Sequence, residues 1–281
     1  MTDMQASLPD FEDPPVVEVA LSLQFDAIRS LRAPQLGLLW TEFRDRFPMV
    51  EEHPPIEPLV ERFGALPRSA EAGIRFQMVK GPPTLRCWFL NQAGTELIQV
   101  QRDRFIQNWR KTTGQEAYPH YPRLRETFAS GVRILAGFVE REGLGEIKPN
   151  QCEVTYVNHL VAGKGWEGFG ELGNVLTVFN ARYSDGFLPR PEEARLALRY
   201  VIRNGSDAPI GRLHVVVEPG YLTSGDRAIY VMRLTARGRP LGEGLEGAMA
   251  FFDIGREWVV RGFTSITTTQ MHHLWRRKDG H

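Results

Sequence analysis

Cysteine is scarce in this chain of 281 residues, and neither sign of charge is in excess. The two cysteines, Cys87 and Cys152, are too few for a disulfide framework or a zinc site built on cysteine pairs. Reduced thiols in a cytosolic protein are the simplest interpretation. Lysine plus arginine number 34, as do aspartate plus glutamate, so the formal net charge is zero. That balance argues against non-specific binding of DNA or of an anionic membrane as the main function.

Long hydrophobic runs are also missing. No apolar run approaches the ~18 residues that a membrane span needs, and residues 1–13 are acidic, unlike a secretory leader. Hydrophobic residues make up 42% of the chain and charged residues 24%, which is normal for a folded domain and excludes wholesale disorder. We therefore expect a folded, cytoplasmic protein that does not enter a membrane.

The first half of the chain predicts strands followed by a long helix. Residues 16–25 alternate in hydrophobicity, which predicts a strand. A helix is expected from Pro34 to about Phe47, and the proline-rich residues 49–58 predict an irregular segment. The elements expected after that are β-prone runs over residues 60–63, 74–79, 84–90 and 95–102, and a helix from Tyr121 to near Gly143.

The second half repeats this order of elements. The expected elements are a strand over 152–161, a glycine-rich loop over 163–173, a short helix over 175–180, strands over 194–203, 212–218 and 228–236, and a helix over 245–263. The leading strands contain Glu18 and Glu153 at corresponding places. An internal duplication would explain this recurrence, and a chance match of patterns is the alternative.

The predicted fold class is therefore α+β, an antiparallel sheet covered by two long helices, with a strand–helix–strands–helix unit that would occur twice. The expected organisation is a disordered N-terminal tail (1–13), a first α+β half (14–147), a second half packed as one unit with the first (148–270), and a C-terminal tail (271–281).

Motifs for familiar catalytic chemistry are missing. The chain has no G-x-S-x-G elbow, no G-x-x-x-x-G-K-[ST] phosphate loop, no H-E-x-x-H and no C-x-x-C. His159 stands alone on a predicted strand and is more simply structural than a metal ligand or a base. We therefore assign no catalytic residue, metal site or cofactor.

Residues 95–111 are the most informative segment. A strand here places Gln99 and Gln101 on one face, and their carboxamides suit a hydrogen-bonding wall. The alternative is an edge strand with a solvated charged end, in which Trp109 packs under the long helix. The residues that follow combine cations, an amide and an aromatic ring, a mixture that can hold an anionic or planar ligand; they are Arg104, Asn108, Trp109, Arg110 and Lys111.

Glu18 and Glu153 are carboxylates inside otherwise apolar strands. Such a group needs a paired cation or a wet face. The expected partners are Arg102, Arg104 or Arg199. A buried ion pair is favoured over a catalytic acid–base couple.

Several segments together resemble one bacterial family of sporadic distribution. They are Pro-Pro-Val-Val-Glu-Val (14–19), Thr-Glu-Leu-Ile-Gln-Val-Gln (95–101), Arg-Phe-Ile-Gln-Asn-Trp-Arg-Lys (104–111), Tyr-Pro-Arg (121–123), Glu-Val-Thr-Tyr-Val-Asn (153–158) and a C-terminal helix ending near Trp275. The resemblance covers nearly the whole chain. It implies a single-piece cytosolic protein and names no activity.

The favoured function is a non-enzymatic binding or regulatory protein with a small anionic ligand or a protein partner. One alternative is an enzyme acting on a phosphorylated or nucleotide substrate, and another is nucleic-acid binding on an uncovered sheet face, which the zero net charge disfavours. A homodimer stays open. The predicted binding residues are Gln99, Gln101, Arg104, Asn108, Trp109, Arg110, Glu18, Glu153, Tyr156 and Asn158.

Overall fold

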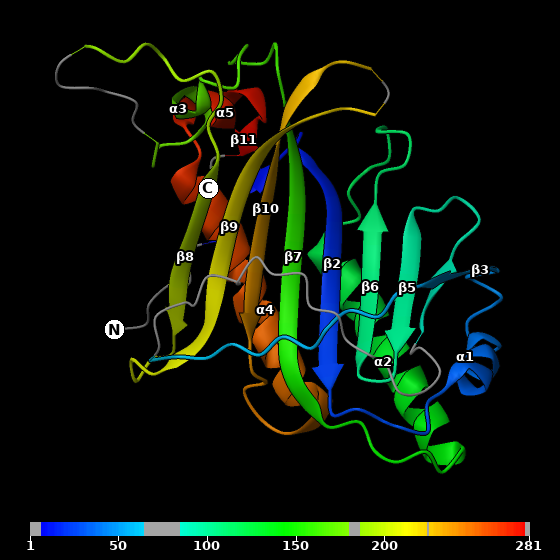
Figure 1. Cartoon of the computed structure of the whole chain (residues 1–281). Coiled ribbons are helices and arrows are strands. Elements are labelled where there is room, and N and C mark those ends of the chain that lie inside the picture. Colours follow the sequence, from blue (N-terminus) through cyan, green and yellow to red (C-terminus); the bar gives the residue numbers. More distant parts are fainter. Residues whose placement is uncertain (1–6, 65–84, 180–185, 224, 279–281) are drawn as a thin grey trace.

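The computed structural model describes residues 7–64, 85–179, 186–223 and 225–278. Within these residues, nine strands form one antiparallel sheet (Figure 1). From one edge to the other they are β3 (Met49–His53), β4 (Arg86–Leu90), β5 (Glu96–Gln101), β6 (Arg104–Arg110), β2 (Val16–Phe25), β7 (Pro149–Val161), β10 (Ala228–Gly238), β9 (Pro209–Tyr221) and β8 (Leu196–Arg203). The predicted α+β class with an antiparallel sheet is confirmed.

Helices lie on one face of this sheet, behind it in Figure 1. The helices of the described residues are α1 (Ala33–Trp40), α2 (Tyr121–Arg141), α3 (Leu172–Val175), α4 (Gly244–Ile266) and α5 (Thr269–Leu274). The rings of Phe128 in α2 and Phe252 in α4 meet with their centroids 4.9 Å apart, so one core runs under both helices. The opposite face of the sheet, called here the open face, carries none of these helices.

Alternation along each strand decides which side chains reach the core. In β5, Ile98 and Val100 face the helices, while Gln99 and Gln101 point to the open face, as the period-two pattern predicts. In β2 a bulge shifts the pairing with β7, and Val16 instead of Val17 is buried on the helix side.

Close approach of α2 to the sheet depends on a glycine. A Cβ atom at Gly131 would lie 2.6 Å from the Phe105 ring of β6. Gly131 lies on the buried, apolar stripe of the helix, and its missing side chain lets the helix axis come down onto the strand.

Some elements differ from the sequence expectation. Residues 49–53 form edge strand β3, because the prolines that predicted irregularity begin only at Pro54. Residues 60–63 form no strand, and 74–79 lie outside the described residues. The expected helix at 175–180 is a single turn over Leu172–Val175.

The two expected tails meet each other. Strand β1 (Asp10–Phe11) pairs with β11 (Arg277–Lys278), and Lys278 Nζ lies 2.6 Å from Asp10 Oδ2. Phe11 is buried among Phe263, His272 and Trp275. The expectation of a disordered segment is therefore wrong for residues 10–13, which this ring and the pairing of β1 with β11 hold in place.

Candidate functional site

A row of polar side chains crosses the open face near the ends of four neighbouring strands. Gln101 of β5 lies opposite Arg104 of β6, which lies opposite Gln24 of β2, which lies opposite Gln151 of β7. We call these four residues the transverse row. Each is at most 6% exposed. Buried polar groups of this kind require hydrogen-bond partners.

The partners come from an extended segment of the same chain, residues 54–63, called here the strap. In Figure 1 the strap runs from β3 across the front of the sheet, at a steep angle to the strands. Gln101 binds both main-chain atoms of Ile56: its Nε2 donates to the Ile56 oxygen at 2.8 Å, and its Oε1 accepts from the Ile56 nitrogen at 2.9 Å.

The same kind of contact repeats along the row. The Leu59 nitrogen donates to Gln24 Oε1 at 3.0 Å, and the Glu61 nitrogen donates to Gln151 Oε1 at 3.1 Å. Arg104 donates to the Glu57 oxygen at 3.3 Å. The row therefore holds the strap through its main chain.

Proline explains why the strap adopts this conformation. Pro54, Pro55 and Pro58 cannot donate a main-chain hydrogen bond and restrict their own φ angles. Such a segment cannot join the sheet as a regular strand. Amides that it retains, at Ile56, Leu59 and Glu61, donate to the glutamines.

One side chain of the strap enters a charged cluster beyond the row. Glu61 is 7% exposed and accepts from Arg212 at 2.5 Å and from His214 at 2.6 Å, with Arg237 at 3.5 Å. Burial alone would raise the pKa of Glu61, but the hydrogen bonds from His214 and Arg212 outweigh it and lower the pKa from 4.5 to about 2. The carboxylate is therefore ionised at neutral pH.

The expected partners of Glu18 and Glu153 were wrong. Glu153 binds Arg237 at 2.5 Å, and Glu18 accepts from Asn108 at 2.6 Å. The reason is the register, because Arg237 of β10 lies directly opposite Glu153 of β7. Arg104, expected to pair with a glutamate, donates to Gln24 at 2.5 Å.

A second polar chain lies beside the row on the open face. Arg86 donates to Gln99 at 2.8 Å, Gln99 donates to Asn108 at 2.8 Å, and Asn108 continues to Glu18. Arg110 turns to the main-chain oxygen of Gly94 at 2.9 Å. The predicted residues on this face therefore belong to separate groups: the chain that ends at Glu18, the transverse row, and the pair of Glu153 with Arg237.

Three predicted residues lie on the helix side of the sheet instead. Trp109 is 4% exposed and packs against Tyr118, with ring centroids 5.5 Å apart. Tyr156 shares a hydrogen bond of 2.8 Å with the Tyr118 hydroxyl, and Asn158 donates to the Met232 oxygen at 3.3 Å. The ten predicted residues are thus divided between the two faces.

Sequence reasoning missed most of the transverse row and its charged cluster. Gln24 was not among the predicted residues. The other missed residues are Gln151, Glu61, Arg212, His214 and Arg237. Alternation could have placed Gln151 on the same side as Glu153, but no local pattern connects Glu61 with a cluster 151 residues further along the chain.

The row keeps unused hydrogen-bonding capacity. Within the described part of the chain, Gln151 Nε2 and Arg104 Nε are buried and have no partner. A buried donor without a partner costs free energy comparable to a lost hydrogen bond. These two atoms could bind carbonyl oxygens of an occupant that fits the row better than the strap does.

No family model, curated protein or solved structure matches this chain. The family resemblance therefore stays a prediction. Among the described residues, no group of three or more histidine, cysteine, aspartate or glutamate side chains is arranged to hold a metal ion. The helices of the described residues include none that is both long and apolar enough to cross a bilayer.

Proposed function

We propose that this is a non-enzymatic binding protein whose open face holds an extended segment of a partner protein, in the place that the strap occupies. The observation that carries the proposal is the in-register transverse row bonded to main-chain atoms. Contacts to the main chain are available to any extended polypeptide, so the same row can accept another segment. In the free protein the strap then acts as a built-in competitor.

The strap's shallow attachment supports its replacement. Leu59 and Val60 are each 48% exposed, so each gains only part of the free energy that full burial of its side chain would give. Its described contacts with the sheet include many polar ones: hydrogen bonds and the Glu61 cluster. A segment with few buried apolar contacts detaches at a lower free energy than the core it covers.

The charged cluster supports a partner that carries an acidic residue. Among the described residues, Glu153, bound to Arg237, is the one carboxylate that stays paired with this cluster when Glu61 leaves. A carboxylate supplied by the partner restores the charge balance of this cluster and accepts charge-assisted hydrogen bonds from it. We therefore infer that the partner segment is extended, resists regular strand pairing as the strap does, and places a glutamate or aspartate at this cluster.

The alternative functions receive less support. An enzyme that uses Glu18 or Glu153 as a base needs that carboxylate free within a cavity, whereas Glu18 binds Asn108 and Glu153 binds Arg237. Nucleic-acid binding on the open face needs exposed, unneutralised cations; Arg212 and Arg237 are bonded to glutamates, and Arg104 is 6% exposed and bonded to Gln24.

We also infer that the chain arose by duplication. Outward from the central pair β2–β7, the order is β6, β5, β4 on one side and β10, β9, β8 on the other. Glu18 lies directly opposite Arg110, and Glu153 lies directly opposite Arg237.

A labelled peptide with the sequence of residues 54–63 tests the proposed function. Glu61→Ala in the full chain removes the strap's ionic contact and should let the peptide bind, whereas the wild-type protein, with its strap in place, should bind it far more weakly. A peptide with glutamine in place of Glu61 should bind the variant at least ~30-fold more weakly, since truncating one partner of a buried charge pair costs about 2–5 kcal/mol. Fluorescence anisotropy gives these affinities.

Glu57→Gln is the matched control, because Glu57 lies on the strap with an exposed side chain. This variant should bind the peptide as weakly as the wild-type protein does. The proposal is contradicted if folded Glu61→Ala protein does not bind the peptide, or binds the two peptides equally well.

A further inference from the structure

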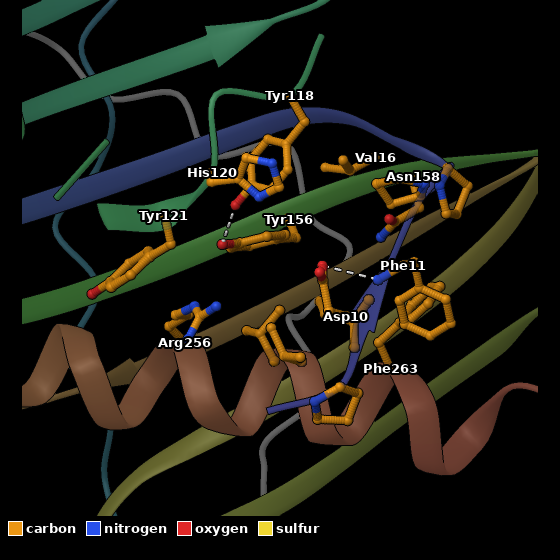
Figure 2. A pocket seen from close by; sticks show the side chains of 16 residues that line it. Asp10, Phe11, Val16, Tyr118, His120, Tyr121, Tyr156, Asn158, Arg256 and Phe263 are labelled. Carbon is orange, nitrogen blue, oxygen red and sulfur yellow. Dashed lines mark hydrogen bonds between the residues drawn. The ribbon is translucent and has the colours of Figure 1, made fainter. Parts of the chain in front are cut away.

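A cavity of about 90 Å³ lies on the helix side of the sheet, away from the strap. Its walls come from β7, the start of α2, the middle of α4 and the N-terminal residues 9–16 (Figure 2). The volume exceeds the ~10–15 Å³ that one water molecule needs. The residues that matter for its chemistry are Phe11, Tyr118, His120, Tyr156, Arg256 and Phe263.

Arg256 gives the cavity a cation without an acidic partner. Its guanidinium stacks over the Tyr121 ring at 5.1 Å and also interacts with the Tyr156 hydroxyl. Among the described residues its buried Nε has no hydrogen-bond partner and no carboxylate forms a salt bridge with it. The nearby carboxylate of Asp253 is occupied by Arg125, at 2.7 and 2.8 Å, and by the Tyr121 hydroxyl at 3.0 Å. A half-buried guanidinium that has no carboxylate partner is costly unless an anion joins it.

Two phenols stand next to this cation. The hydroxyls of Tyr118 and Tyr156 lie 2.8 Å apart, and Figure 2 shows both above Arg256. Burial raises the pKa of both tyrosines, so both hydroxyls keep their protons at neutral pH. One hydroxyl proton forms the hydrogen bond between the two oxygens, so the second hydroxyl proton is available for donation to a ligand.

His120 completes the polar end and is held in an unusual backbone conformation. Its φ of 61° and ψ of 152° belong to a region that is nearly restricted to glycine. Its ring packs on Tyr118, with centroids 5.2 Å apart. Such strain is typical of sites where the surrounding structure fixes a functional side chain.

Most of the remaining wall is apolar, with Phe11, Val16, Val259 and Phe263 among the lining residues, and Asn158 and Asp10 are the polar exceptions. The one carboxylate among the lining residues, Asp10, is bonded to Lys278. We propose that this cavity binds a small organic carboxylate: Arg256 and a tyrosine hydroxyl hold the carboxyl group, His120 lies beside it, and the apolar body of the ligand packs between Phe11 and Phe263. The site is independent of the strap and of any partner bound there.

Calorimetric titration of the full chain with benzoate, butyrate and the neutral isostere benzamide tests this site. Benzoate should bind at least ~10-fold more tightly than benzamide, because only the carboxylate forms charge-assisted hydrogen bonds. Arg256→Gln should abolish that preference. Arg133→Gln, the same change on the exposed face of α2, should leave it intact.

His120→Gly gives a second and independent reading. Glycine adopts the observed φ and ψ without strain, so the melting temperature should rise while the affinity for benzoate falls. The proposal is overturned if the folded wild-type protein binds neither acid at ~10 mM, if benzoate and benzamide bind equally, or if Arg256→Gln retains the preference. An unchanged benzoate affinity in His120→Gly would overturn the assigned role of the imidazole.

Discussion

Glu61 is the residue that fastens the strap most firmly, because its carboxylate is buried among Arg212, His214 and Arg237. Its lowered pKa makes this attachment depend on pH. A carboxyl group with a lower pKa in the folded than in the unfolded state stabilises the fold fully above the unfolded value, here near 4.5, and loses that contribution as the pH falls toward about 2.

The free-energy difference between wild-type protein and Glu61→Gln should therefore shrink by about 2 kcal/mol between pH 6 and pH 3. Denaturant unfolding at the two pH values measures it. Glu57→Gln, with an exposed carboxyl group on the same strap, should show no such change relative to wild type. If the difference in unfolding free energy between the wild-type protein and Glu61→Gln does not vary with pH, the role given to this carboxylate is wrong.

At the scale of single elements, the distance between helix α2 and strand β6 depends on one glycine in the helix. Gly131 lies against Phe105, whereas a methyl group at Gly137, further along the same helix, would meet no atom within 4 Å. Gly137 is also exposed. The same substitution at the two sites therefore has opposite expected effects.

Gly131→Ala should destabilise the protein by about 1–3 kcal/mol, because its methyl group forces the helix and the Phe105 ring apart. Gly137→Ala should stabilise it by up to ~1 kcal/mol through helix propensity. Urea midpoints of the two variants report both effects. Equal changes of one sign would mean that α2 does not lie on β6 as described.

The helices and strands were largely predictable because each has a local pattern. The alternation of residues 97–102 correctly separates Gln99 and Gln101 from Ile98 and Val100, and the three- and four-residue spacing of α2 places Gly131 on the core side. The structure of residues 49–58 was harder to predict. Their prolines show where strand β3 must end, but they do not show on which surface the strap lies.

At the scale of the whole molecule, the site depends on contacts that no local pattern encodes. The transverse row joins four strands whose order in the sheet is not their order in the chain. Glu61 meets Arg212 across 151 residues. Gln99 and Gln101 form hydrogen bonds on the open face, but they are only 7% and 3% exposed, and the sequence offered no sign that the chain itself would cover Gln101.

The proposed function requires that the strap can leave while the sheet stays folded. Hydrogen exchange of the full chain under native conditions measures this directly. The amides of Ile56, Leu59 and Glu61, which donate to the transverse row, should exchange at least ~100-fold faster than the core amides of β2 and β7. Exchange of the strap amides at the rate of the core amides would show that the strap leaves only when the whole protein unfolds, and would contradict the proposed binding face.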